Sequence, residues 1–311
     1  MTWGIVSTVK APLADIERFA AYHIELGAAR ICVYLDDDNE EAYTALKRHP
    51  KLRVFRTHDA HWRSKNRPQK HQARQGANAR HAYKRKAEGL DWLAHIDVDE
   101  FLYPLAKPIS AQLAALPSAC MAARVRPVEA LWHPQGETHF KAMTNERKQR
   151  QRETEAIYPT FGAHLNGGFL SHVAGKLFVR TGADEADYRI HNVYLNGVEN
   201  PGQEELLGTE LCHMHATSFE HWMQNYRYRL AHGVYRAELK PNRPRAAGGL
   251  TIHELLNTLE QTEGPEGLKA FYEEVCTATP ALLARLDAHG LLRSHSLALE
   301  AARQKHFPSG A

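Results

Sequence analysis

Residues 90–102 read L-D-W-L-A-H-I-D-V-D-E-F-L, a short apolar run that ends in the acids Asp97, Asp99 and Glu100. Burying an unpaired carboxylate costs far more than exposing it, so acids clustered at the end of a buried strand indicate a function. In an extended chain, residues two apart point to the same side, which would let Asp97 and Asp99 share one cation while Glu100 faces away from both. Carboxylate oxygens suit Mg²⁺ or Mn²⁺, and these ions accept phosphates as further ligands. The stretch therefore predicts a metal-diphosphate site at the carboxyl end of a central strand.

The bulk composition is that of a folded globular protein. The chain has 311 residues, of which 43% are hydrophobic and 24% charged, enough for one large domain or a main domain with an appendage. No apolar run approaches the roughly 20 residues of a membrane span, and the first residues are too polar for a signal peptide. The four cysteines are far apart and form no C-x-x-C pair. We therefore expect reduced thiols and a cytoplasmic location.

Basic residues are unevenly distributed although the net charge is only +3. Residues 61–87 contain nine Lys or Arg and no acid, and residues 141–152 contain five against one acid. A nucleic-acid-binding helix would need interleaved aromatic side chains, and only Trp62 and Tyr83 occur in the first stretch. A solvated helix face is the plainer reading of that stretch. A metal hydrolase would need closely spaced ligands such as H-x-x-x-H, a spacing that the sequence lacks.

The N-terminal third alternates between strand-like and helix-like segments. Strands are expected at residues 5–9, 31–35 and 52–55 and at the acid-tipped stretch, with helices at 15–26, 40–48 and 68–88, the first capped by Asp15. This alternation predicts an α/β fold with a mostly parallel sheet and right-handed crossovers. Ligands bind such sheets at the carboxyl ends of the strands, where Lys10, the acids 36–38 and Asp97 stand. Asp36 in such a cluster has a second reading, as a loop or capping residue.

Beyond residue 102 the alternation stops. A helix is expected at 110–116, strands at 120–128, 176–180, 188–193 and 211–215, and ordered loops over a site at 133–172. Ser218 would cap a helix that carries Phe219, Trp222, Tyr226 and Leu230 on one face. Further helices would break at Gly264-Pro265 and at Pro280. We predict one domain over residues 1–215 and a C-terminal helical extension over 216–311.

The D-V-D-E-F sequence that closes the apolar strand resembles the D-x-D motif of GT-A nucleotide-sugar transferases. It is most similar to a D-x-D-E-F branch of glycosyltransferase family 2, related to the galactan-synthase-like transferases. Residues 6–10 (V-S-T-V-K), 21–27 (A-Y-H-I-E-L-G) and 34–39 (Y-L-D-D-D-N) fit the same branch in order. The resemblance covers residues 1–105 well and 170–230 loosely, and it implies a GT-A fold.

The resemblance also implies a nucleotide-diphosphate-sugar donor (a UDP-sugar is favoured), a divalent metal (Mn²⁺ or Mg²⁺) and an acceptor hydroxyl. The acceptor would be a glycan or a lipid-linked molecule at the inner membrane face, and nucleic acid is not expected as a partner. Asp97 and Asp99 would contact metal and donor, and Thr8, Lys10 and Asp36 would line the base and ribose pocket. A late histidine would complete the metal shell, the candidates being His191, His213 and His215. The basic side chains Arg63, Lys65, Arg67, Lys70 and Arg74 would add positive potential around the leaving diphosphate.

An inverting transfer needs a carboxylate that takes the proton of the acceptor. We place Asp99 at the reaction centre and name as candidate bases Glu129, at the end of a predicted strand, and Glu153 or Glu155, in R-E-T-E. A transferase fold that binds nucleotides or polyanions without catalysis is the remaining alternative.

Overall fold

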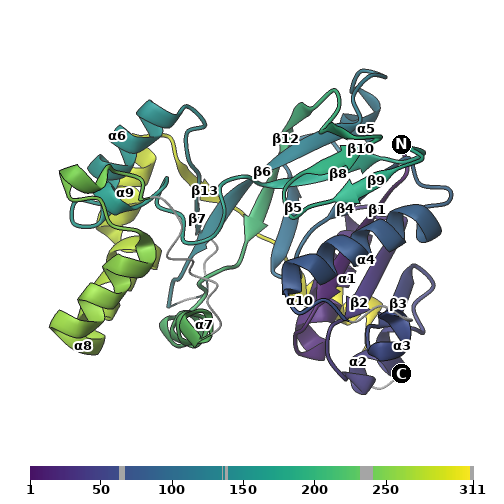
Figure 1. Ribbon diagram of the computed structural model, residues 1–311, viewed down its shortest axis with the longest axis horizontal. Helices are drawn as coiled ribbons and strands as arrows, with labels where there is room; N and C mark the ends of the chain where they lie inside the picture. The colour runs from purple at the N-terminus through teal and green to yellow at the C-terminus, as the bar shows by residue number, and fades with distance from the viewer. Residues whose placement is uncertain (63–66, 135, 137–138, 232–240, 309–311) are drawn as a thin grey trace. The chain divides into compact units, whose positions relative to one another are not determined.

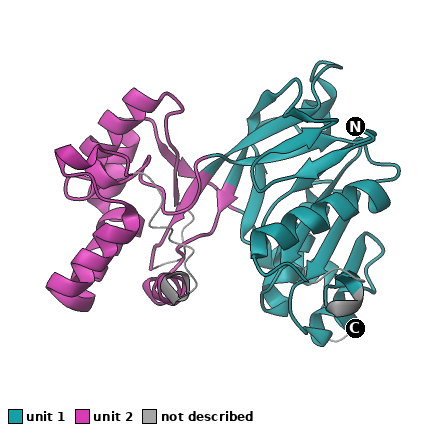
Figure 2. Ribbon diagram, in the orientation of Figure 1, with its two compact units in different colours: residues 1–127, 174–211, 297–311 teal, residues 128–173, 212–296 magenta. Residues whose placement is uncertain are grey.

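The computed structural model describes residues 1–62, 67–134, 136, 139–231 and 241–308, without the side chains of residues 59–60 and 228–231. Two compact units make up the chain (Figure 2). Unit 1 comprises residues 1–127, 174–211 and 297–311, and unit 2 comprises residues 128–173 and 212–296.

Unit 1 is built on four parallel strands, seen in purple to blue in Figure 1. They are β1 (Trp3–Val9), β2 (Arg30–Leu35), β3 (Leu52–Arg56) and β4 (Trp92–His95), in the spatial order β3-β2-β1-β4. The helices between them are α1 (Leu13–Glu25), α2 (Glu40–Leu46), α3 (Asp59–Trp62) and α4 (His71–Lys86). The predicted α/β alternation is confirmed, because β-branched and apolar runs form the strands.

Antiparallel strands extend this sheet beyond β4. Strand β8 (Lys176–Arg180) pairs antiparallel with β4, and β6 (Ala122–Leu131) pairs antiparallel with β8. Strand β12 (Glu204–His213) pairs with β6 and with β5 (Glu100–Pro104), which precedes α5 (Ile109–Ala114). A separate three-stranded sheet contains β9 (Ala186–Tyr188), β10 (Val193–Leu195) and β11 (Val198–Glu199). The sheet is therefore mixed, and the fold is a GT-A-like α/β fold as predicted.

Helix α4 packs closely on one face of the parallel strands. Its small residues Ala79 and Ala82 are fully buried in a core shared with β1, β2 and β4. Gly76 faces the backbone of β9, and a Cβ built at Gly76 would lie 2.7 Å from the carbonyl oxygen of Tyr188. A larger residue at this position would push the helix off β9, so Gly76 fixes the depth of α4.

Helix α1 packs against β5. The Tyr22 hydroxyl donates to the carbonyl of Leu102 (2.9 Å), and the Leu102 N–H donates to His23 Nε2 (3.2 Å). His23 is fully buried and is a packing residue, as its position on an apolar helix face indicates. The predicted cap is wrong by three positions: the N-cap is Pro12, and Asp15 lies in the first turn. Helix α10 (Leu299–His306) returns to α1.

Unit 2 is mostly helical. Its elements are β7 (His139–Lys141), α6 (Arg147–Ile157), η1 (Gly162–His164), α7 (Phe219–Ala231), η2 (Arg245–Ala247), α8 (Ile252–Cys276), α9 (Pro280–Ala288) and β13 (Leu292–Ser294). The loops predicted over 133–172 therefore contain a strand and helix α6. Only Thr154 and Ile157 of α6 are buried, and most of its residues are charged or polar. Its sequence therefore has no apolar pattern from which a helix could be predicted. Glu146 starts the helix by accepting the N–H groups of Lys148 and Gln149.

The C-terminal helices follow the predicted breaks. Ser218 Oγ accepts the N–H of His221 at the start of α7, and α8 kinks at Gly264, whose φ is 65°. Trp222 and Tyr226 are core residues, whereas the side chain of Leu230 lies outside the described residues. The predicted domain boundary at 215 lies close to the junction of the units at 211, but residues 128–173 belong to unit 2 and 297–311 to unit 1.

All four cysteines are buried, and no disulfide joins them. Among the helices that the structure describes, none is both long enough and apolar enough to cross a membrane.

Candidate functional site

Helix α4 holds the carboxyl ends of three parallel strands of unit 1. Asn78 Nδ2 donates to Thr8 Oγ1 in β1 (3.0 Å), Arg74 binds Asp36 just after β2, and Gln75 Nε2 donates to Asp97 just after β4 (2.5 Å). Binding sites of open α/β sheets lie at this edge. Three of the predicted site residues are therefore brought together by one helix, which the sequence placed correctly but gave no such role.

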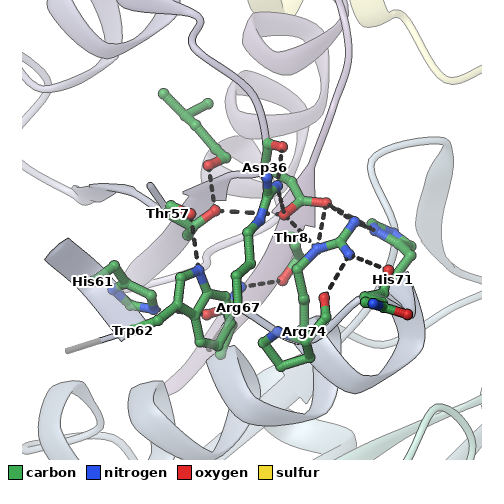
Figure 3. Close-up of polar contacts among 12 residues, drawn as sticks. Thr8, Asp36, Thr57, His61, Trp62, Arg67, His71 and Arg74 are labelled. Atoms are coloured by element: carbon green, nitrogen blue, oxygen red, sulfur yellow. Dashed lines mark hydrogen bonds and ion pairs between the residues drawn. The ribbon is translucent and has the colours of Figure 1, made fainter. Parts of the chain in front are cut away.

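Asp36 is the centre of a cluster of basic side chains (Figure 3). Arg74 Nε lies 2.8 Å from Asp36 Oδ1 and its Nη2 2.6 Å from Oδ2, which is a bidentate pair. Arg67 Nη2 donates to Asp36 Oδ1 (2.9 Å) and to its carbonyl oxygen (2.7 Å), and His71 Nδ1 lies 3.0 Å from Oδ2. Arg74 Nη1 also donates to the carbonyls of Pro68 and Gln69. The carboxylate thus organises the whole segment 67–74.

The electrostatics of this cluster favour an ionised Asp36. Burial alone would raise the pKa of Asp36, but the hydrogen bonds from His71, Arg74 and Arg67 outweigh it and hold the pKa well below its usual range. The Asp36 side chain is 2% exposed, whereas that of Arg67 is 40% exposed. The cluster therefore buries its negative charge and presents positive charge to the surroundings. The predicted contact of Asp36 with the nucleotide base stays a prediction, and the basic face is the accessible part.

The acidic tip forms a turn and not an extended strand. Strand β4 ends at His95, and Val98 and Asp99 lie in the turn that leads into β5. Strand alternation therefore does not place Asp97 and Asp99 on one side, contrary to the prediction. Glu100 also differs from expectation, because it does not face away from Asp97: its Oε2 accepts the Asp97 N–H at 2.7 Å. Glu100 is completely buried, whereas Asp97 and Asp99 are half-buried.

Lys176 is the cation that binds this tip. Its Nζ lies 2.7 Å from Asp97 Oδ2 and 3.5 Å from Glu100 Oε2, and its side chain is 1% exposed. Burial would raise the pKa of Asp97, but Lys176 outweighs it and lowers that pKa to about 2. Neither Lys176 nor Gln75 was predicted as a site residue from the sequence. A lysine directly before the apolar run L-F-V is the signal that marks Lys176.

His95 lies behind the acidic tip and is also buried. Both of its ring nitrogens, and the hydroxyl of Tyr188, lack a hydrogen-bond partner within the part of the chain that the structure describes. Burial, and next the charge of Lys176, lower the pKa of His95 to about 4, so the ring is neutral at pH 7. Both side chains line a small cavity together with His191.

The other predicted site residues are spread over both units. Lys10 is exposed at the end of β1, and His191 Nδ1 lies 2.9 Å from the Gly175 carbonyl oxygen, both in unit 1. His215 lies in unit 2, where its ring centroid is 5.1 Å from that of His213. Its role as a metal ligand, like that of His191, stays a prediction. Arg63 and Lys65 lie outside the described residues.

The candidate bases are in poor positions for proton transfer. Glu129 is 0% exposed, and its oxygens accept the N–H groups of Leu170 (3.0 Å) and Ser171 (2.9 Å) while Lys141 Nζ lies at 3.1 Å. Burial opposes ionisation of Glu129, but Lys141 outweighs it and lowers the pKa to about 2. Glu155 is exposed on α6 and accepts from Gln151 (2.7 Å). Neither geometry supports the base role, which stays a prediction.

The donor chemistry of the acidic tip fits a hard divalent cation. Asp97 and Asp99 supply carboxylate oxygens at a half-buried position, which is the ligand type that Mg²⁺ and Mn²⁺ prefer. Asp97 is shared, however, because Oδ1 accepts from Gln75 and Oδ2 from Lys176. The residues therefore fit a metal, which Asp99 and Asp97 would hold together.

Comparison with the curated proteins gives no match to the chain. Among solved structures, HddC from Yersinia pseudotuberculosis is similar at 10% identity over 44% of this chain and 67% of that chain, with a TM-score of 0.29, a likeness too weak to support an argument.

The model of glycosyltransferase family 92 matches residues 9–180, which is more than half of the 311 residues and includes α4, the acidic tip and Lys176. The match supports a glycosyltransferase but not the D-x-D-E-F branch of family 2 that the motif resembles. The protein belongs to glycosyltransferase family 92 and is a glycosyltransferase.

Proposed function

We propose that this glycosyltransferase moves a sugar from a nucleotide-diphosphate donor, with a UDP-sugar favoured, to the hydroxyl of a glycan or lipid-linked acceptor, with inversion. The observation that carries the proposal is the single helix α4, which links a basic cluster on Asp36 to the acidic tip at Asp97. In such a donor the nucleoside diphosphate is the leaving group, and negative charge grows on it as its bond to the sugar breaks, so it needs positive charge in the site. The basic cluster would supply positive charge directly, and the acidic tip would supply it through a bound metal ion.

The basic half would bind the diphosphate. Arg67 and His71 are exposed while Asp36, which holds them, is buried. Their side chains are therefore fixed at one end and accessible at the other, which reduces the entropy lost when an anion is bound. Thr8 and Lys10 stand at the adjacent end of β1, where the base and ribose are proposed to lie.

The acidic half would hold Mn²⁺ or Mg²⁺. Asp99, with Asp97 beside it, is the proposed ligand, and the metal would act as a Lewis acid that stabilises the leaving diphosphate. Inversion requires a general base that accepts the acceptor proton. Glu129 and Glu155 lie in surroundings that do not suit proton transfer, and Asp99 is proposed as a metal ligand, so we assign no base.

Calorimetric titration tests the donor. UDP and GDP are titrated into the wild-type protein with and without Mn²⁺, and the same titrations are run on Asp99→Asn. We expect UDP to bind in the presence of Mn²⁺ and the metal-dependent part of the affinity to be lost in Asp99→Asn. Absence of binding of either nucleotide in every metal condition would overturn the proposal. The exposed Arg80→Lys on α4, away from both clusters, is the matched control and should bind UDP as the wild type does.

A further inference from the structure

Lys176 has a fixed position at the acidic tip. It begins β8, which pairs antiparallel with β4 and β6. The preceding Gly175 has φ of 73°, and a Cβ there would lie 2.1 Å from the Val125 carbonyl oxygen. Only glycine permits this backbone conformation and this close approach of β6. The start of β8, and with it the Lys176 side chain, is therefore held firmly against the neighbouring strand.

The ammonium of Lys176 joins two carboxylates that the turn brings together. It contacts Asp97 Oδ2 at 2.7 Å and Glu100 Oε2 at 3.5 Å, while the same Glu100 oxygen accepts the Asp97 N–H. Lys176 and Glu100 are 1% and 0% exposed, so neither charge is compensated by water. A buried ion is strongly destabilising when its partner is removed, so these three groups depend on one another.

A divalent cation and Lys176 would compete for the same oxygen. Metal ligation by Asp97 Oδ2 places a second cation where the ammonium already makes a short contact. Two cations a few ångströms apart in a partly desolvated site repel each other strongly. The repulsion falls when an anion joins the site, because a diphosphate adds negative charge and its own oxygen ligands to the metal.

We propose that Lys176 is the resident cation of the acidic tip: it holds Asp97 in the donor-free protein, and a divalent metal binds tightly only together with a nucleotide diphosphate. This inference rests on the proposed function and adds an order to it, because metal and donor would enter as a complex. Lys176 is then a positioning residue that prevents metal binding in the absence of donor. Its removal should create a metal site in the donor-free protein.

Lys141 offers a matched control. It is likewise buried and paired with a carboxylate, Glu129 at 3.1 Å, but its ammonium also donates to the carbonyls of Gly168 (2.6 Å) and Val275 (2.8 Å). Both members of this pair are 0% exposed. Lys141→Met therefore removes a buried ammonium without opening a carboxylate to a metal.

The experiment measures Mn²⁺ binding to donor-free protein, by the loss of the electron paramagnetic resonance signal of free Mn²⁺. Wild type, Lys176→Met, Lys176→Arg and Lys141→Met are compared, first without nucleotide and then with UDP. We expect Lys176→Met to bind Mn²⁺ at least about tenfold more tightly than the wild type without UDP. Lys176→Arg, which keeps the charge, and Lys141→Met should bind as weakly as the wild type. With UDP present, wild type and Lys176→Met should differ much less.

The outcomes separate this inference from the proposed function. If donor-free wild type and Lys176→Met bind Mn²⁺ equally, the inference is overturned, whatever UDP does. If the wild type binds no nucleotide with any metal, the proposed function fails on its own. Should Lys176→Met not fold, the double variant Lys176→Met/Glu100→Gln removes one charge of each sign from the buried cluster. This double variant must show the same gain in Mn²⁺ affinity over the donor-free wild type, and an affinity equal to that of the wild type would again overturn the inference.

Discussion

Two buried lysines, one in each unit, are paired with carboxylates in different ways. In unit 2, Lys141 and Glu129 contact each other and several backbone groups, and both side chains are 0% exposed. In unit 1, Lys176 is equally buried, but its nearest partner Asp97 has a side chain that is 28% exposed. The first is a closed pair and the second an open pair. An ammonium group and a carboxylate are therefore fully buried together in unit 2, whereas in unit 1 the carboxylate of the pair remains accessible to solvent.

The largest effect expected from this difference is on stability. Lys141→Met should lower the free energy of unfolding by about 3–5 kcal/mol, because Glu129 is left charged and fully buried. Lys176→Met should cost less, about 1–3 kcal/mol, because the exposed part of Asp97 can be hydrated and the buried Glu100 keeps the hydrogen bond from the Asp97 N–H. Urea denaturation at pH 7, followed by tryptophan fluorescence, measures both. Equal losses would show that the two pairs are not different in kind.

The second largest effect is expected at low pH, where the two pairs should lose different amounts of stability. The pKa of Glu129 is lowered from 4.5 to about 2, so its contribution to stability is complete above pH 4.5 and is lost as the pH falls towards 2. The pKa of Asp97 is lowered from 3.8 to about 2, which gives a smaller loss over a narrower range. From these shifts we expect a loss of roughly 2–3 kcal/mol from Glu129.

Urea midpoints measured from pH 5 to pH 2 test this order. Wild type should lose stability most steeply, Asp97→Asn somewhat less, and Glu129→Gln least, because that variant lacks the group with the larger shift. A Glu129→Gln protein that remains as acid-sensitive as the wild type would assign the acid response to other carboxylates.

A substitution in the basic cluster on Asp36 should have a smaller effect, which is expected on the affinity for UDP. Arg74→Lys keeps the charge but loses the bidentate contact with Asp36 and the contacts with the carbonyls of Pro68 and Gln69. We expect UDP affinity to fall about tenfold, because the segment that presents Arg67 and His71 loosens. Arg80→Lys, on the same helix, should change it by less than about twofold. Calorimetry measures both, and similar losses in the two variants would contradict a specific role for Arg74.

The strands were predictable from the sequence because their signals are local. Apolar and β-branched runs located β1, β2 and β3 to within two residues, and β8 was predicted with its observed bounds. Helix α6 was missed because its stability depends on the Glu146 cap and two buried residues, not on an apolar stripe. A sequence pattern therefore predicts a strand or helix only where residues close together in the sequence make the contacts that stabilise it.

The site was predictable only in part, for the same physical reason. Acids that follow an apolar run identify Asp97 and Asp99 without any knowledge of the fold. Lys176 reaches Asp97 across 79 positions of sequence, and no period or spacing encodes such a contact. The orientation of Glu100 was misjudged because strand alternation was assumed through Val98 and Asp99, where the chain turns.

The smallest expected effect belongs to Glu155, and it limits where the general base can be. Glu155 is exposed on α6 in unit 2 and accepts a hydrogen bond from Gln151 of the same helix, and such a surface carboxylate is not held in one position for proton transfer. Glu155→Gln should change the turnover of a UDP-sugar by less than about twofold, since surface changes of this kind usually have small effects. Release of UDP measured over a pH series is the appropriate assay, because a general base would also shift the acidic limb of the profile. A loss of a hundredfold or more with that shift would assign the base to α6.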